Sequence, residues 1–181
     1  GRTMDDAVGE ALDKGAKLLG LTYPGGAQME KFAQDGDPGA FKFPVYQSSG
    51  NDLSFSFSGL KTSMLYTLQK MNETEVKQNF ADLCASYQQA AVVQLVRQTQ
   101  TALKQGTYNS LGLSGGVANN QTLRDRFHAL AEDHGFPLLA AQKKHTGDNA
   151  AMIAFAALAD PSGTWSDLDG SLNVSPSLKM D

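Results

Sequence analysis

Residues 111–120 read LGLSGGVANN, and this stretch decides the fold class of the chain. A short apolar run meets two glycines and then opens a new periodic segment, which predicts a buried strand that turns tightly into a helix. Glycines let a flat ligand approach the backbone, and a helix N-terminus offers free N–H groups. Asn120 carries both a donor and an acceptor, which suits a ribose hydroxyl or a base edge. A plain tight turn with an Asn helix cap fits the same residues, so both interpretations stay open.

Hydrophobic periodicity on both sides of this stretch predicts an alternation of helices and strands. Residues 75–105 hold a helical period without Gly or Pro, which indicates one long helix or two nearly continuous ones. Residues 120–131 form an amphipathic helix and residues 138–141 a further strand. The other expected elements are helices at residues 3–19, 27–34 and 60–71, an apolar and buried helix that ends at Ala159, and strands at residues 41–46 and 53–57. Such an alternation is typical of an α/β or α+β lobe.

The N-terminal helix and the strand at residues 53–57 rest on specific local signals. Thr3 is expected to cap the N-terminus of this helix, and the positive end of the helix dipole favours Asp5 and Asp6 beside it. Gly20 is expected to end the helix. In residues 53–57 apolar side chains alternate with serines, which indicates a strand with one buried face. The strand at residues 41–46 contains a proline and is expected at a sheet edge.

Composition narrows the class of protein further. The chain has 181 residues, of which 41% are hydrophobic and 19% charged, which indicates one globular domain or one lobe of a larger enzyme. The net charge is −4, and no basic stripe interleaved with aromatics is present, so charge gives no sign of nucleic-acid binding. No apolar run is long enough to span a membrane, and a single cysteine fits a reducing compartment. The chain opens Gly1-Arg2-Thr3 without Met, from which we expect a piece of a longer protein without a signal or transit peptide.

A carboxylate and a glycine pair form a second candidate site. Asp13 lies just off the apolar face of the first helix, and the loop ending in Gly25-Gly26 follows that helix. A carboxylate can accept two hydroxyls, as a ribose requires. A solvated surface acid beside Lys14 and Lys17 is the alternative.

The segment from His145 to Asn149 is a third candidate. Asp148 is a hard oxygen ligand for a cation, although a helix cap is the commoner role at this position. The three histidines lie at 128, 134 and 145, no two of them four residues apart, so no helix face grips a metal with two histidines. Lys61, at a helix start, suits a phosphate or plain solvent exposure, and Cys84 is expected to be an inert core residue.

Five segments of the sequence together resemble one family. They read GRTMDDAVGEALDK at residues 1–14, KLLGLTYPGG at 17–26, LSFSFSGLKT at 53–62, SGGVANN at 114–120 and DNAAMIA at 148–154. The chain thereby resembles the C-terminal portion of TsaD, also called Gcp and formerly described as an O-sialoglycoprotein endopeptidase.

The resemblance implies a fold and a reaction. Residues 1–160 would form one lobe and part of the nucleotide cleft of an actin-like, hexokinase-like and Hsp70-like fold, with residues 161–181 as a tail. The family transfers the threonylcarbamoyl group from threonylcarbamoyl-AMP to the N6 amine of the adenosine beside the anticodon, in tRNAs that read codons starting with A. A bacterial TsaB-like paralogue and a TsaE-like ATPase are the implied partners, and the location is cytoplasmic. No side-chain nucleophile is required, because a mixed anhydride is already activated.

The resemblance also implies roles for particular residues. The residues assigned to the adenylate, or to ATP, are Asp13, Gly26 and Asn120, with Glu30, Gly115 and Gly116 as further contacts. Asp148 would bind one divalent metal, iron or zinc, together with a His-x-x-x-His pair that lies outside this chain, and the metal would hold the anhydride and polarise its carbonyl. The family often has Cys-Thr before the metal aspartate, whereas Thr146-Gly147 stand here. Gly147 adds backbone freedom before Asp148.

Three other functions remain as alternatives. Without the histidine pair, the chain would act as an inactive nucleotide-binding or interaction module. A metalloprotease, as the older family name suggests, lacks the expected His-Glu-x-x-His motif. A sugar or acetate kinase of the same fold group would need a phosphate-binding hairpin outside this chain.

Overall fold

The structure is a computed structural model that describes residues 1–50, 52–147 and 150–159. The chain divides into two compact units, Gly1–Thr146 and Gly147–Asp181, and each is described here by itself. Among the described residues, no helix combines the length and the apolar character needed to cross a membrane.

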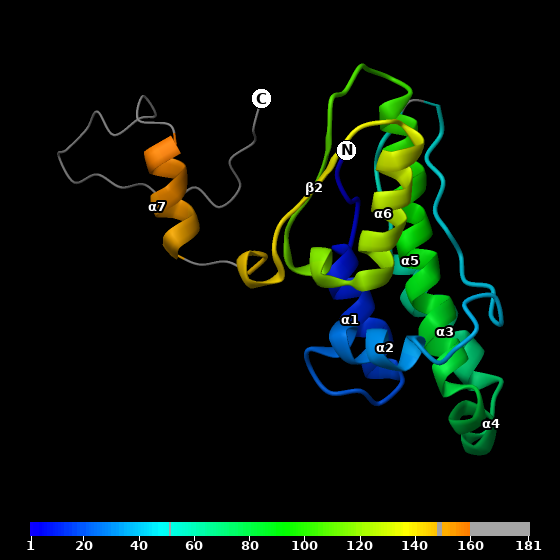
Figure 1. Cartoon of the computed structure of the whole chain (residues 1–181). Helices are drawn as coiled ribbons and strands as arrows, with labels where there is room; N and C mark the ends of the chain where they lie inside the picture. The colour runs from blue at the N-terminus through cyan, green and yellow to red at the C-terminus, as the bar shows by residue number, and fades with distance from the viewer. Residues whose placement is uncertain (51, 148–149, 160–181) are drawn as a thin grey trace. The chain divides into compact units, whose positions relative to one another are not determined.

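The fold is mixed α/β and mostly helical, as expected from the sequence (Figure 1). The helices are α1 (Val8–Leu18), α2 (Gly25–Ala33), α3 (Ser58–Gln69), α4 (Glu73–Gln78), α5 (Phe80–Leu103), α6 (Gln121–Asp133) and α7 (Ala150–Ala159), with short 3₁₀ turns at Gly116–Asn119 and Lys143–His145. The strands are β1 (Leu111–Leu113) and β2 (Leu138–Ala140).

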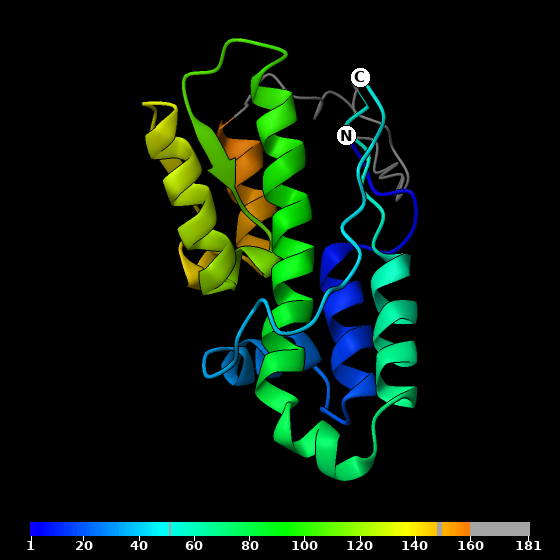
Figure 2. The ribbon, with the colours of Figure 1, turned by 90° about the vertical axis from the view of Figure 1, so that its right-hand side faces the viewer.

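The first core lies where α1, α2 and α3 pack against the first half of α5, and Figure 2 shows α1 and α3 side by side. Tyr87 of α5 occupies its centre, fully buried, and its hydroxyl donates a hydrogen bond to the carbonyl of Ala11 at 2.9 Å. Gly15 makes room for this ring, because a Cβ there would lie 2.4 Å from the ring carbon Cε1. The tyrosine therefore locks α5 onto α1 by shape and by one buried hydrogen bond.

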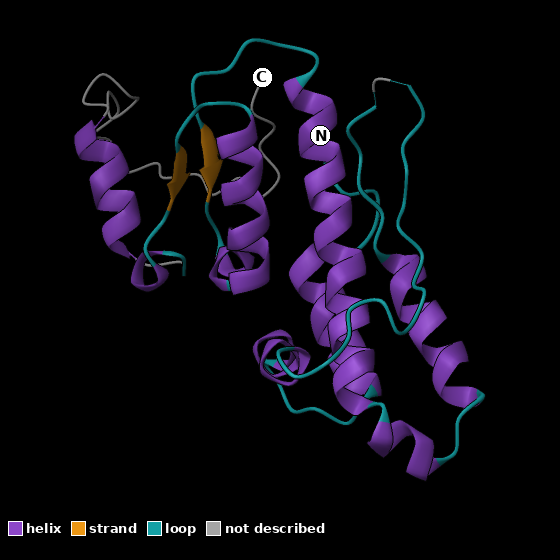
Figure 3. Cartoon of the chain, turned by 45° about the vertical axis from the view of Figure 1, so that its right-hand side comes forward, coloured by secondary structure: helices purple, strands orange, loops and turns teal. Residues whose placement is uncertain are grey.

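The second core joins the other half of α5 to α6 and the two strands (Figure 3). Strands β1 and β2 pair in parallel, with Leu111 opposite Leu138 and Leu113 opposite Ala140. Leu123 and Phe127 of α6 pack beneath them, next to Val92 of α5. The predicted strands, the amphipathic helix and the long helix, which breaks at Asn79 between α4 and α5, are all confirmed.

The two other predicted strands are wrong. Residues 41–46 and 53–57 are irregular, with one isolated bridge between Thr3 and Phe55, and no neighbouring strand in the described part of the chain pairs with them. Phe43 and Phe57 are buried nonetheless: Phe43 packs edge-on against Tyr87 with the ring centroids 5.5 Å apart, and Phe57 is 2% exposed, whereas Phe41, Tyr46 and Phe55 are half-buried. The alternation therefore marks one side of an extended segment lying on helices, not a sheet.

The first helix begins later than expected, and Asp5 does not lie at its N-terminus. Helix α1 begins at Val8 without a side-chain cap, Met4 is exposed, and Thr3 does not cap it. The Asp5 carboxylate instead accepts hydrogen bonds from the backbone N–H groups of Phe57 and Ser58, at 2.8 and 3.2 Å, and from serine hydroxyls beside them. Asp5 thus serves the N-terminus of α3, where a negative charge is favourable.

The electrostatics of Asp5 follow from these contacts. Partial burial acts to raise the pKa of Asp5, but hydrogen bonds from Ser56, Phe57 and Ser58 outweigh it and lower the pKa from 3.8 to about 2. The expected partner of the α1 dipole, Asp6, forms an ion pair with Lys14 at 2.6 Å instead.

Helix α7 in the second unit is exposed where its side chains are described. Within its own unit, Met152, Phe155 and Leu158 are 45%, 70% and 77% exposed, and the burial of this helix stays a prediction. The described part of its unit contains no second helix or strand against which an apolar face could pack.

Candidate functional site

Most of the residues singled out in the sequence meet at one cavity of about 450 Å³. Helices α1 and α2, the Gly116–Asn119 turn and the start of α6 form its walls. The expected site residues that line it are Asp13, Gly26, Glu30, Gly116 and Asn120. We call this space the Asp13 cavity. Its volume lies within the range of ordinary small-ligand pockets.

Asp13 is fixed toward this cavity by the loop that follows α1. Its Oδ1 accepts a hydrogen bond from the backbone N–H of Gly26 at 2.7 Å, and the side chain is half-buried. The neighbouring Lys14 pairs with Asp6 and Glu10. Asp13 also borders a hollow that Lys14 and Lys17 line, so the interpretation of Asp13 as a surface acid beside these lysines stays open.

Glu30 occupies the opposite wall and links α2 to α6. Its Oε1 accepts a hydrogen bond from the backbone N–H of Gln121 at 2.7 Å, in the first turn of α6. The second carboxylate oxygens of Asp13 and Glu30 have no hydrogen-bond partner among the described residues. Two acceptor oxygens are thereby available in one cavity.

The two glycines at the start of α2 have different surroundings. A Cβ on Gly25 would lie 2.5 Å from the Cβ of Ala16, so Gly25 allows α2 to approach α1. A Cβ on Gly26 would meet Leu12 at 3.4 Å and Asp13 Oδ1 at 3.5 Å, which is ordinary contact. Helix packing therefore requires glycine at Gly25. At Gly26 a side chain would fit, and the absence of one leaves the backbone accessible from the cavity.

Asn120 is both a helix cap and a wall of the cavity. Its Oδ1 accepts a hydrogen bond from the backbone N–H of Leu123 at 2.9 Å, which confirms the cap interpretation. Its Nδ2 donates to Oε1 of Gln88 at 2.7 Å, and the residue is 6% exposed. The preceding turn needs glycine at Gly115, where φ is +86°, although Gly115 is absent from the described cavity lining.

Gln88 is a residue that the sequence reasoning missed. It lies on α5, 4% exposed, and contacts Asn120 directly. The only available signal was a polar side chain on a buried helix face, and the same is true of Gln94 and Gln98. Position along the helix alone does not distinguish the three.

Asn119 connects the cavity to the end of the first unit. Its Nδ2 donates to the hydroxyl of Thr146 at 2.6 Å, and this buried hydroxyl donates to the carbonyl of Lys143 at 2.9 Å. Asn119 Oδ1 is buried and has no hydrogen-bond partner in the described structure. Thr146 is one of the two residues that depart from the resembled family's pattern.

The expected metal ligand, Asp148, lies outside the described residues. Among the residues that are described, no three His, Cys, Asp or Glu side chains come together as a metal site. His128 contacts Glu132 at 3.3 Å, and His134 stacks on Phe136. The described side chains therefore do not by themselves fit the implied metal.

The single cysteine is confirmed as a core residue. Cys84 is fully buried, and this burial raises the pKa of its thiol to about 12, so the thiolate is suppressed at neutral pH. Lys61, the candidate phosphate contact, is exposed on α3.

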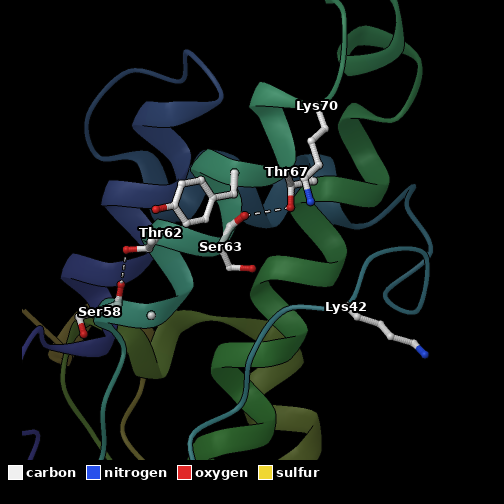
Figure 4. A pocket seen from close by; sticks show the side chains of 8 residues that line it. Lys42, Ser58, Thr62, Ser63, Thr67 and Lys70 are labelled. Carbon is white, nitrogen blue, oxygen red and sulfur yellow. Dashed lines mark hydrogen bonds between the residues drawn. The ribbon is translucent and has the colours of Figure 1, made fainter.

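A second hollow, of about 620 Å³, lies along α3 (Figure 4). Its lining is made of hydroxyl groups and lysines and includes no carboxylate among the described residues: Lys42, Ser58, Gly59, Thr62, Ser63, Tyr66, Thr67 and Lys70. The Thr67 hydroxyl donates to the Ser63 carbonyl at 2.9 Å, whereas Figure 4 shows Lys42 projecting away from α3. We call this space the α3 hollow.

The fold and the cavity define a class: an α/β protein with a carboxylate-lined small-ligand cavity beside a Gly-Gly turn. The family model described as TsaD, tRNA N6-adenosine threonylcarbamoyltransferase, matches residues 1–155. The chain therefore belongs to the TsaD family.

Curated relatives agree with this assignment. A tRNA N6-adenosine threonylcarbamoyltransferase from Anaeromyxobacter sp. (strain Fw109-5) is 45% identical over 99% of this chain and 54% of the relative. Proteins of the same name from Porphyromonas gingivalis and Thermosipho africanus are 45% and 44% identical, each over 86% of this chain, and over 46% and 47% of the relatives. The chain thus spans about half the length of the curated relatives it matches.

Proposed function

We propose that this chain supplies the adenylate-binding part of a tRNA N6-adenosine threonylcarbamoyltransferase. The observation that carries the proposal is the meeting of Asp13, Gly26, Glu30 and Asn120 at one cavity, from three separate stretches of sequence. Family membership supports the reaction, and the cavity supports the choice of these residues as the adenylate site. The cavity would then belong to one lobe of an actin-like cleft.

The chemistry of the cavity suits the nucleoside end of the adenylate. The free oxygens of Asp13 and Glu30 can accept the two ribose hydroxyls, since carboxylates are acceptors with spare lone pairs. Gly26 lets the sugar approach the backbone closely. No lysine, arginine or histidine is among the described lining residues, so the phosphate would point away from the two carboxylates.

The proposed reaction needs no nucleophile from the protein. The N6 amine nitrogen of the tRNA adenosine bonds to the carbamoyl carbon, and the bond from that carbon to the phosphate oxygen breaks. AMP leaves with the electron pair, and the amine loses a proton. The cavity residues hold the adenylate so that the two reacting groups meet in one geometry, which is how binding energy lowers such a barrier.

The implied metal enters the proposal only as an expectation about Asp148. Iron or zinc would require Asp148 and histidines from outside this chain, and would supply a Lewis acid for the anhydride carbonyl. The TsaB-like and TsaE-like partners and a cytoplasmic location likewise remain part of the proposal through the family.

The α3 hollow supports a contact with the tRNA backbone. Lys42 and Lys70 line it with hydroxyls and without a carboxylate, although the whole chain carries a charge of −4. Neither lysine forms an ion pair with another described residue. Lysines and hydroxyl groups are usual contacts of nucleic-acid phosphates.

Calorimetric titration with AMP tests the cavity. The wild-type chain is expected to release heat on binding, and Asp13→Ala to abolish it, while Asp125→Ala, at an exposed position of α6, leaves it unchanged. Absence of heat from the wild type, or equal loss in both variants, overturns the proposal.

A second function, a nucleotide-binding module without catalysis, would use the same cavity, since nucleotide binding needs only its lining residues. Incubation of the chain with threonylcarbamoyl-AMP and tRNA, followed by mass spectrometry of the nucleosides, separates the two. Threonylcarbamoyl-adenosine in the tRNA supports the transferase, whereas AMP binding without product supports the module.

A further inference from the structure

A directional chain of hydrogen bonds runs from α6 through the Asp13 cavity wall into α5. The Leu123 N–H donates to Asn120 Oδ1 at 2.9 Å, and Asn120 Nδ2 donates to Gln88 Oε1 at 2.7 Å. Gln88 Nε2 then donates to the Thr122 hydroxyl at 3.0 Å. The chain therefore leaves α6 at Leu123 and returns to it at Thr122.

The direction of every bond is fixed by its first member. A backbone N–H can only donate, so the Asn120 atom facing Leu123 must be the oxygen. The Asn120 nitrogen then faces Gln88, which must present its own oxygen, and its nitrogen is left to meet Thr122. Reversing either amide would set two donors against each other or leave a buried group unpaired, which is costly.

We propose that Gln88 is a positioning residue that anchors the Asn120 amide, whose orientation the Leu123 N–H sets, in the position that serves the nucleotide. The proposal rests on the proposed function of the Asp13 cavity. Gln88 is not part of the described cavity lining and acts through Asn120. With Oδ1 committed to α6, Asn120 retains one Nδ2 hydrogen that has no partner among the described residues. Asn120 is thereby set to offer a donor, so the ligand group beside it is an acceptor, such as a ribose oxygen or a ring nitrogen.

Helix α5 offers a matched control for this role. Gln98 is 6% exposed, close to the 4% of Gln88, and its Nε2 donates to the Ser48 hydroxyl at 2.8 Å and the Ser54 carbonyl at 2.7 Å. It too is a buried glutamine whose side chain is hydrogen-bonded to two other residues, but neither of them lines the Asp13 cavity. A purely structural role for buried glutamine would make the two positions behave alike.

The test compares Gln88→Met with Gln98→Met, since methionine keeps the volume and removes the amide. The first readout is the Asn120 side-chain amide signal in a ¹⁵N–¹H spectrum of the nucleotide-free chain. The second is the Kd for AMP measured by calorimetry. We expect Gln88→Met to shift the Asn120 signals and to weaken AMP binding by about five- to tenfold, the effect of one misplaced hydrogen bond.

Two further variants should weaken AMP binding by less than Gln88→Met does. Gln88→Glu keeps an acceptor for Asn120 and is expected to restore most of the affinity. Thr122→Val removes the partner of Gln88 Nε2 but leaves the bond from Asn120, and it is expected to weaken AMP binding by less than Gln88→Met does. Gln98→Met should change neither readout, whatever its effect on thermal stability.

The outcomes separate this proposal from the proposed function. Unchanged Asn120 signals in Gln88→Met, or equal weakening of AMP binding by Gln98→Met, overturn the positioning role. If the wild-type chain fails to bind AMP, the proposed function of the cavity is wrong. The Asn120 signals still decide in that case whether Gln88 orients the amide.

Discussion

The Asp13 carboxylate and the backbone N–H of Gly26 lie 2.7 Å apart and join α1 to the first turn of α2. The donor of this hydrogen bond is a backbone N–H, so the Asp13 carboxylate is oriented without a second side chain. Of the two glycines that follow the Tyr23-Pro24 bond, packing requires only Gly25, because a Cβ on Gly26 would make ordinary contacts.

Alanine substitutions at this pair are expected to separate folding from binding. Gly25→Ala places a methyl group 2.5 Å from Ala16 and should destabilise the chain by about 1–3 kcal/mol, as overpacking does. Gly26→Ala meets its neighbours at 3.4 Å and should unfold near the wild-type temperature while binding AMP more weakly. Thermal unfolding and calorimetry on both variants test this. A Gly26→Ala chain that binds AMP like the wild type would exclude close approach of the ligand at this backbone.

Asp5 is expected to make stability depend on acid pH. Its folded-state pKa of about 2 lies below the ordinary 3.8, so its contribution is present above pH 4 and is lost as the pH falls toward 2. Asp5→Asn should therefore lower stability at pH 7 by about 1 kcal/mol, as the loss of a helix cap does, and have little effect at pH 2. Urea unfolding at the two pH values measures the difference. An equal loss at both values would show that the charge of Asp5 is irrelevant to α3.

The contact between Gly15 and Tyr87 predicts strong intolerance in the first core. Gly15→Ala would place a Cβ 2.4 Å from the tyrosine ring and should destabilise the chain by about 1–3 kcal/mol. Gly112→Ala is the matched control, because no atom lies within 4 Å of a Cβ at that strand position. Denaturant unfolding compares the two, and equal effects would mean that Tyr87 is free to move aside.

The α3 hollow predicts a salt-sensitive contribution to tRNA binding. The double variant Lys42→Ala and Lys70→Ala should weaken binding and reduce the salt slope by about 0.7–0.9 for each phosphate that a lysine no longer neutralises. The control, Lys31→Ala with Lys104→Ala, removes the same charge at exposed positions outside the hollow. Fluorescence anisotropy with labelled tRNA at several salt concentrations measures both. Equal slopes for the two double variants would assign the effect to net charge alone.

Local periodicity predicted those helices and strands in which the pattern of buried side chains matches the period of the secondary structure. Helices α5 and α6 and the strand pair β1 and β2 were predicted because each buries a regular pattern of apolar side chains. Residues 53–57 show the same alternation but lie on helices, and a sequence does not state whether a partner strand exists. The role of Asp5 was missed because its partners lie some fifty residues away.

The candidate site was only partly accessible to the same reasoning. The Gly-Gly turn, Asn120 and Asp13 were visible as local candidates, but Glu30 stands out only when α2 and α6 are folded together. Motif resemblance supplied Glu30, and the geometry places it at the same cavity as Asp13 and Asn120. Gln88 could not be separated from Gln94 and Gln98, since only the tertiary contact with Asn120 distinguishes it.

Because Asn120 secures the first turn of α6 as well as bordering the cavity, its replacement has two inseparable consequences. Asn120→Ala removes a helix cap worth about 1 kcal/mol and alters the ligand site in the same step. Ligand occupancy and the fraying of α6 are accordingly coupled, so a bound nucleotide should slow amide exchange at Leu123 and its neighbours. Inactivity of an Asn120 variant would then report on helix integrity as much as on recognition.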